Sequence, residues 1–159
     1  MNEITTTIRI IINGNYQLSY IKKSILGYNE HMKRDNIVIK ISIDGIEYIN
    51  TKIFTDMGDA IIDLQGQLPN NIQIACCHSC EHGNFCPYGN AGNKIYCFKN
   101  YSLQNYNDVY NIFDSWAMNG FDNDMLPINE LLHWCELYKN VARDSYSYNS
   151  WINFSDDDK

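Results

Sequence analysis

Long apolar runs, basic charge and familiar catalytic motifs are all scarce in this sequence of 159 residues. The longest apolar run is far shorter than the ~18 residues that indicate a membrane span. Residues 1–12 lack the basic region and the small-residue cleavage site of a signal peptide. The sequence therefore predicts a protein that is neither embedded in a membrane nor secreted, and we expect it in the cytoplasm.

Basic side chains are outnumbered by acidic ones. The chain has 12 Lys and Arg against 19 Asp and Glu, which gives a formal net charge of −7. This charge repels nucleic acids and anionic membranes and favours a basic partner. The imbalance belongs to the second half, since residues 1–70 carry a net charge of −1 and residues 71–159 carry −6. Acidity that only maintains solubility explains the same charge.

The spacing of histidines and glycines excludes several enzyme classes. The sequence has no H-E-x-x-H pair, no phosphate-binding glycine loop and no deaminase pattern of H-x-E with P-C-x-x-C. A thiol–imidazole pair of Cys77 or Cys80 with His82 leaves nucleophilic or redox chemistry open. Redox C-x-x-C centres usually open a helix, whereas this one is expected to follow a strand. We therefore expect a protein that is not an enzyme.

The first half is predicted to be an antiparallel meander. Isoleucines alternate with other residues in the period-2 pattern of half-buried strands. The expected strands cover residues 4–12, 16–20, 37–43 and 46–53. Asn13-Gly14 and Asp44-Gly45 predict hairpin turns, because both central residues of such turns need positive φ. The polar stretch 22–35 is expected to interrupt the strands.

The hydrophobic period changes to that of a helix after Thr55, which is expected to be the N-cap. Met57, Ile61 and Leu64 recur at helical spacing, and Pro69 ends the segment. We expect this helix to pack on the sheet.

Two further helices are predicted in the second half. One begins after residue 107 and ends at Asn119-Gly120, and the last begins at Pro127 and includes Tyr138. The expected fold is a single α+β domain over residues 1–159, because domains commonly run to ~100–150 residues. Residues 143–159 are expected to form a mobile tail.

A cysteine-rich turn lies between the two halves, with strands expected on either side over 72–76 and 95–98 that pair with each other. Cys77 and Cys80 form a C-x-x-C pair, the spacing at which two thiolates bind one metal ion. The predicted ligands of a structural zinc ion are Cys77, Cys80, Cys86 and Cys97, with His78 and His82 in reserve. The alternative is buried thiols without metal, in which Cys76, Cys97 and Cys135 are small hydrophobic residues, because free Cys is among the most buried residue types.

The order of residues in this turn resembles an uncharacterised family of small bacterial proteins. The shared core reads C-C-x-x-C at 76–80, aromatic-x-P-Y-G at 85–89 and C-F at 97–98, followed by a basic residue. The likeness covers roughly residues 55–100, and the family has no established activity. The family has a serine-like residue where this chain has Cys86, so a four-thiolate site with Cys86 would be particular to this chain.

The functional hypothesis is a non-catalytic protein that binds a basic protein partner, most specifically a bacterial immunity protein that neutralises a toxin domain. Small size, the lack of catalytic motifs and an acidic, aromatic-rich second half motivate it. The residues expected to contact the partner are Asp122, Asp124, Glu130, Trp134, Glu136 and Trp151. A helix that is solvated on its polar face and packed on its apolar face is the simpler explanation of the same residues. The alternatives are a metal-dependent or thiol redox enzyme centred on the cysteine turn, and a scaffold or regulatory protein.

Overall fold

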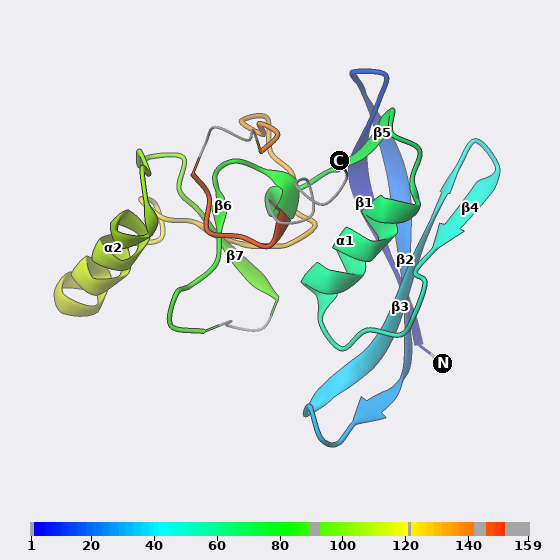
Figure 1. Ribbon diagram of the computed structural model, residues 1–159, viewed down its shortest axis with the longest axis horizontal. Coiled ribbons are helices and arrows are strands. Elements are labelled where there is room, and N and C mark those ends of the chain that lie inside the picture. Colours follow the sequence, from blue (N-terminus) through cyan, green and yellow to red (C-terminus); the bar gives the residue numbers. More distant parts are fainter. Residues whose placement is uncertain (1, 90–92, 121, 142–145, 152–159) are drawn as a thin grey trace. The chain divides into compact units, whose positions relative to one another are not determined.

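The computed structural model describes residues 2–89, 93–120, 122–141 and 146–151. These residues form an α+β fold with a five-stranded antiparallel sheet, two α-helices and a second sheet of three strands (Figure 1). The chain divides into two compact units, unit 1 (Met1–Ala75) and unit 2 (Cys76–Lys159). The single domain expected from chain length stays a prediction. Neither α-helix of the described residues is long and apolar enough to cross a lipid bilayer.

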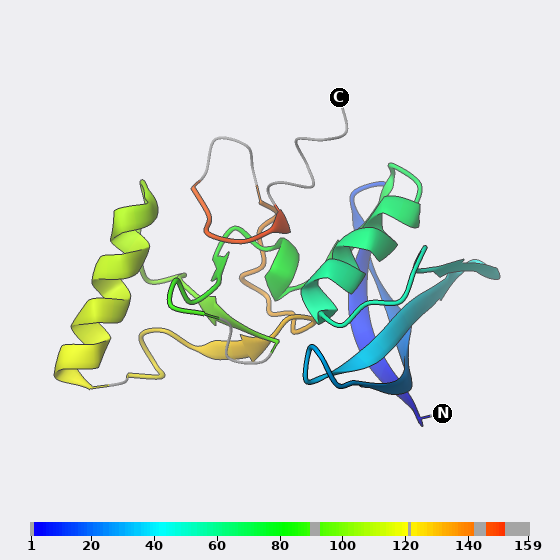
Figure 2. The ribbon, with the colours of Figure 1, turned by 60° about the horizontal axis from the view of Figure 1, so that its bottom comes forward.

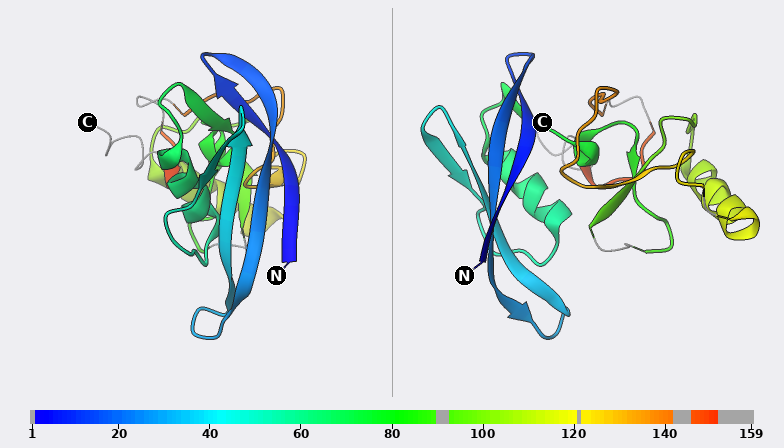
Figure 3. Two further views of the ribbon diagram at one scale, coloured as in Figure 1. Left: turned by 90° about the vertical axis from the view of Figure 1, so that its right-hand side faces the viewer. Right: turned by 180° about the vertical axis from the view of Figure 1, so that it is seen from behind.

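Unit 1 is built on the five-stranded sheet. Its strands are β1 (Asn2–Ile12), β2 (Asn15–Asn29), β3 (Arg34–Ile43), β4 (Ile46–Ile49) and β5 (Ile72–Ala75), in the order β4-β3-β2-β1-β5. β1 and β2 lie side by side along the whole length of β1 (Figure 3). The predicted meander is confirmed, and the turn residues Asn13-Gly14 and Asp44-Gly45 all have positive φ.

Two strands of unit 1 differ from the sequence-based expectation. β2 continues to Asn29, through part of the polar stretch that was predicted to interrupt it, because its backbone keeps pairing with β3 as far as Arg34. Strands pair through backbone hydrogen bonds, which polar residues form as well as apolar ones. The hydrophobic periodicity therefore does not predict that β2 continues to Asn29. β5 pairs with β1 and not with residues 95–98. The predicted pairing of the strands on either side of the cysteine turn is therefore wrong.

The core of unit 1 lies between the sheet and helix α1 (Met57–Gln67), which Figures 1 and 2 show on one face of the sheet. Alternate residues of a strand point to the same face, so the regular isoleucines converge there. The buried side chains of the strands are Ile8, Ile10, Ile21, Ile37, Ile39, Ile41, Ile43, Ile72 and Ile74, and those of α1 include Ala60, Ile61 and Leu64. Each fully buried isoleucine contributes about 1.5–3 kcal/mol of transfer free energy.

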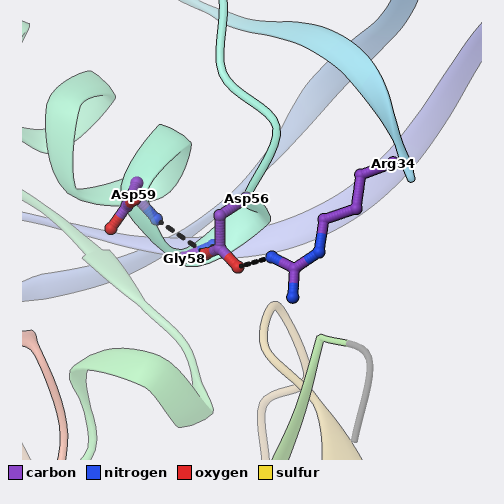
Figure 4. Close-up of polar contacts among 4 residues, drawn as sticks. All are labelled: Arg34, Asp56, Gly58 and Asp59. Atoms are coloured by element: carbon purple, nitrogen blue, oxygen red, sulfur yellow. Dashed lines mark hydrogen bonds and ion pairs between the residues drawn. The ribbon is translucent and has the colours of Figure 1, made fainter. Parts of the chain in front are cut away.

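Helix α1 begins after Asp56 rather than after Thr55. The Asp56 carboxylate accepts hydrogen bonds from the N–H groups of Gly58 at 2.8 Å and Asp59 at 3.3 Å. Arg34, at the start of β3, donates to the other oxygen of the same carboxylate at 3.0 Å (Figure 4). A carboxylate both satisfies the free N–H groups of the first turn and complements the helix dipole, which explains the choice of cap.

Unit 2 contains the smaller sheet. Its elements are the 3-10 helix η1 (Cys77–Ser79), the strands β6 (Gly83–Asn84), β7 (Lys94–Cys97) and β8 (Ile128–Glu130), and helix α2 (Tyr106–Asn119). The strand order is β6-β7-β8. Helix α2 was predicted from sequence, and Gly120 ends it with a φ of +92°. An aromatic core, consisting of Tyr96, Phe98, Val109, Phe113 and Leu126, joins α2 to β7.

The predicted last helix is wrong. Residues 127–138 form β8 and a series of turns instead, with Ile128 paired to Tyr96 and Glu130 paired to Lys94. The helical spacing of the leucines is overridden because β8 covers the edge of β7, whose backbone groups would otherwise lack partners. The formation of β8 depends on its pairing with β7, more than thirty residues earlier in the chain. Local hydrophobic periodicity therefore does not predict it.

The predicted mobile tail over 143–159 lies partly outside the described residues. In its described part, residues 146–151, the Ser147 hydroxyl donates to the Gly83 carbonyl at 3.0 Å, and Trp151 is only 4% exposed. These side chains therefore have partners within unit 2, and the mobility of the tail stays a prediction.

Candidate functional site

The cysteine-rich turn begins at η1 and is held by the segment that follows β8. The Cys77 N–H donates to the His133 carbonyl at 2.7 Å, and the His78 N–H donates to Leu131 at 3.1 Å. Further on, Cys80 forms an isolated β-bridge with Asn140. The turn is thus fixed by residues more than fifty positions away.

Strand β6 passes directly against η1. A Cβ atom at Gly83 would lie 2.0 Å from the Cys77 carbonyl oxygen and 2.9 Å from Cδ1 of Ile95. Only glycine allows so close an approach of two backbone segments. Gly83 also pairs with Cys97 in β7, so this contact brings the backbone of Cys77 close to that of Cys97.

Four cysteines line one small cavity of about 10 Å³, which is the size of a single water molecule or ion. They are Cys77 from η1, Cys80 just after it, Cys97 from the end of β7 and Cys135 from the turns after β8. We call these four side chains the thiol cluster. His82 lines the same cavity.

Three of the four cysteines, Cys77, Cys80 and Cys97, have raised pKa values, which favours the protonated thiol. Burial raises the pKa values of Cys77, Cys80 and Cys97, and the neighbouring cysteines raise them further. Cys77 is 8% exposed and Cys80 is 6% exposed. Because the thiolate is the nucleophile, a buried and protonated thiol is poorly suited to redox or nucleophilic chemistry.

Backbone groups oppose the effect of burial at two of these cysteines. Hydrogen bonding with the backbone of Lys139 and His82 lowers the pKa of Cys80, and hydrogen bonding with the backbone of Lys99 lowers the pKa of Cys97.

The structure brings together three of the four predicted metal ligands and separates the fourth. Cys86 packs against the aromatic core instead. Cys135, which sequence reasoning treated as a small hydrophobic residue of a helix, takes the fourth place in the cavity. No spacing motif links Cys135 to the C-x-x-C pair, so its position in the sequence carries no sign of this role.

The two reserve ligands are in different environments. His78 is fully buried, with its ring edge-on to Phe85 and to Trp151 at centroid distances of 5.6 and 5.3 Å, and its Nε2 shares a hydrogen bond with Ser150. His78 therefore belongs to the interior of unit 2, whereas His82 stays beside the thiol cluster. Within residues 2–89, 93–120, 122–141 and 146–151, no group of three or more His, Cys, Asp and Glu side chains is already arranged to hold a metal ion.

His82 also lines a larger cavity of about 310 Å³, together with Glu81, Ser102 and Tyr146 among others. This volume lies at the lower end of the range for small-molecule sites. Burial lowers the pKa of His82 despite the opposing effect of Glu81, whose carboxylate lies 3.6 Å from Nε2. The cavity thus offers a neutral imidazole and a carboxyl group for hydrogen bonding.

The predicted partner-binding residues divide into exposed carboxyl groups and less accessible tryptophans. Asp122, Asp124, Glu130 and Glu136 are exposed, and Glu130 also forms an ion pair with Lys94. Trp134 is half-buried, and Trp151 is buried against His78. Trp151 therefore cannot serve as an exposed anchor for a partner in this structure, because its ring fills the interior of unit 2.

The outer face of the unit 1 sheet was missed by sequence reasoning. Tyr16, Leu18 and Tyr20 lie on the face of β2 opposite α1 and are 50%, 59% and 59% exposed. We call these three side chains the outer-face row. Their alternation predicted a strand correctly, but the two-residue turn sets Tyr16 opposite Ile11, which places the row on the outer face.

Comparison with protein-family models, curated proteins and solved structures gives no match for this chain. The resemblance to the bacterial family with the C-C-x-x-C core stays a prediction.

Proposed function

We propose that this protein is a non-catalytic protein-binding protein, most specifically an immunity protein that neutralises a basic toxin domain. The observation that carries the proposal is the outer-face row, in which Tyr16, Leu18 and Tyr20 are each at least half exposed. Tyrosine is enriched in protein interfaces, because it supplies a large rigid contact area with a hydroxyl at its tip. Two tyrosines with a leucine between them on one strand provide a contact surface of the kind that recognises proteins.

Polar groups surround this row, as in the rim of an interface. On β1, Thr7 pairs with Tyr20, and Glu3 lies further along the same face. Lys40 and Glu47 of the neighbouring strands form an ion pair at 3.0 Å. The outer face of the sheet therefore combines an apolar centre with charges of both signs. Its local charge does not indicate whether the partner is basic or acidic.

The basic character of the partner is inferred from unit 2. Asp122, Asp124 and Glu136 are exposed, and the segment 71–159 has a net charge of −6. Carboxyl groups at a surface attract a basic protein over a distance of about one Debye length, ~8 Å at physiological salt, and so raise the association rate.

The test is co-expression with the protein encoded by the adjacent gene, read out as growth protection and as co-purification. The row variant Y16S/L18S/Y20S is expected to weaken binding at least ~10-fold, since truncation of one central interface residue commonly costs more than about 1 kcal/mol. The matched control is I46S/I53S, which removes two apolar side chains that are just as exposed elsewhere in unit 1.

The second arm is a charge reversal, D122K/D124K/E136K. It is expected to slow association at low salt and to have little effect at high salt, where screening removes the attraction. Binding without growth protection would indicate a scaffold or regulatory protein instead of an immunity protein. If neither a partner nor protection is found, or if the row variant binds as tightly as the I46S/I53S control, the proposal is wrong.

A further inference from the structure

We propose that the thiol cluster is a structural zinc site, with Cys77, Cys80, Cys97 and Cys135 as its four ligands. The site differs from the one predicted from sequence, because Cys135 replaces Cys86. It concerns the architecture of unit 2 and is independent of the proposed function.

The first argument is the way the backbone brings the four cysteines together. Cys77 and Cys80 come from the short turn of η1, and Cys97 and Cys135 come from two other segments. A tetrahedral structural zinc site is commonly built from cysteine pairs on separate segments in this manner. The close approach at Gly83 and the hydrogen bond from Cys77 N–H to the His133 carbonyl fix these segments relative to one another.

The second argument is the chemistry of the cavity lining. All four cysteines and His82 line the cavity. Cysteine sulfur and histidine nitrogen are the ligand atoms that structural zinc sites use.

The third argument is the size of the cavity between the thiols. About 10 Å³ accommodates one ion and no larger ligand. With Zn–S bonds of about 2.3 Å, the sulfurs of a tetrahedral site lie about 3.8 Å apart. Since the described residues show no ligand group already arranged for a metal, the thiols would have to turn toward the cavity. A cysteine does so by rotation about its single side-chain torsion, between staggered positions.

Zinc would also stabilise this part of unit 2. The thiol cluster lies in a region whose strands are only two to four residues long. Zinc binding releases the thiol protons and couples the free energy of coordination to folding, about 10–16 kcal/mol in small zinc peptides. The ion would thereby join η1, β7 and the turns after β8.

The two remaining cysteines are natural controls. Cys86 packs against the aromatic core, and Cys76 receives a contact from the Ser79 hydroxyl at 3.9 Å from its sulfur. Neither lines the cavity. Serine at Cys86 should therefore leave metal binding intact, whereas the ligand set predicted from sequence requires Cys86.

The experiment measures zinc content in the full-length chain by elemental analysis, and then replaces zinc with Co²⁺ to read the coordination from its absorption spectrum. Wild type and C86S are expected to hold one metal ion per chain with the spectrum of a tetrahedral four-thiolate site. C135S is expected to lose at least ~10-fold in affinity for Co²⁺, since a ligand is removed. C135H, which keeps a metal-binding side chain, should restore binding with a spectrum of mixed sulfur and nitrogen ligands.

Three results would overturn the proposal. One is metal binding that C86S abolishes and C135S leaves unchanged. Another is wild-type protein that binds neither Zn²⁺ nor Co²⁺ while all its cysteines titrate as thiols. The last is a C135H chain whose Co²⁺ spectrum equals that of wild type, which would place residue 135 outside the coordination sphere. The spectrum of C135H keeps the test decisive even where C135S fails to fold.

Discussion

Units 1 and 2 are stabilised in different ways. In unit 1, β1 and β2 pair over eleven consecutive positions, and one residue type, isoleucine, fills most of the core. In unit 2 the strands are two to four residues long, and much of the structure is held by single side chains that bond to distant backbone groups. A long regular ladder distributes its stability over many equivalent bonds, whereas unit 2 depends on particular groups.

The side chains around β6 illustrate this dependence. The Asn149 amide donates to the Gly83 carbonyl at 2.8 Å and to the His78 carbonyl at 3.2 Å. The Asn84 side chain accepts from the Tyr148 N–H and donates to the His82 carbonyl. A few bonds of this kind attach residues 146–151 to the cysteine turn.

The sequence supplies a probe that separates the two units. All three tryptophans, Trp116, Trp134 and Trp151, belong to unit 2. Tryptophan fluorescence therefore follows unit 2 alone during unfolding, while far-ultraviolet circular dichroism follows the secondary structure of both units.

The largest effect is expected for Gly83→Ala. The added Cβ would lie 2.0 Å from a backbone oxygen, which cannot be relieved by rotation of a side chain. We expect the stability of unit 2 to fall by at least ~4 kcal/mol, the range of the most disruptive single substitutions. The measurement is urea unfolding followed by tryptophan fluorescence.

Gly45→Ala is the matched control in unit 1. Its φ is +81°, but an added Cβ would meet no atom within 4 Å. The expected cost is about 1–2 kcal/mol from backbone conformation alone, measured by urea unfolding with circular dichroism. An equal loss of unfolding free energy in Gly83→Ala and Gly45→Ala would contradict this prediction, because it would show that the close contact at Gly83 adds nothing to the cost of the substitution.

An intermediate effect is expected for one buried asparagine in each unit. Asn50 accepts from the Ile39 N–H at 2.8 Å and donates to the Ala60 carbonyl at 2.8 Å, so it links β3 to α1. Asn84 has the corresponding role in unit 2. Replacing either by alanine leaves buried backbone groups without a partner, at about 1–3 kcal/mol for each group.

N50A and N84A also test whether the units unfold together. If each unit unfolds independently, N84A shifts the fluorescence transition and N50A leaves it in place. If both variants shift fluorescence and circular dichroism by the same amount, the chain is a single cooperative domain, as predicted from its length. Coincident transitions in the wild type would support the same conclusion.

The smallest effect is expected for the pH dependence of unit 1. Burial alone raises the pKa of Asp63, but hydrogen bonds from the Thr51 hydroxyl and N–H and from Asn50 outweigh burial and leave this pKa below its ordinary value. The resulting stabilisation is present above the ordinary carboxyl pKa of ~4 and is lost as the pH falls through the lowered folded pKa.

Because Asp63 is only partly buried, solvent screening limits this contribution to less than about 1 kcal/mol. Asp63→Asn should therefore flatten the pH dependence of unit 1 stability slightly as the pH falls below the ordinary carboxyl pKa of ~4. The measurement is urea unfolding by circular dichroism at each pH. A D63N profile that is steeper than wild type would contradict the assignment.

The sequence by itself determined most of unit 1 and the two α-helices. The alternating isoleucines indicated which face of β1 and β3 is buried, although Ile4 on that face of β1 is 48% exposed, and Asn13-Gly14 and Asp44-Gly45 fixed the turns. Helices α1 and α2 also follow from their own spacing. These features depend on interactions within a few residues, so local pattern and turn geometry are sufficient to specify them.

Only the tertiary structure decided the arrangement of the cysteine turn. The pairing of β5 with β1, the strand β8 in place of a helix and the arrival of Cys135 beside Cys77 all join segments far apart in the chain. Their physical cause is the pairing of exposed strand edges and the burial of side chains between distant segments, which leave no periodic mark in the sequence.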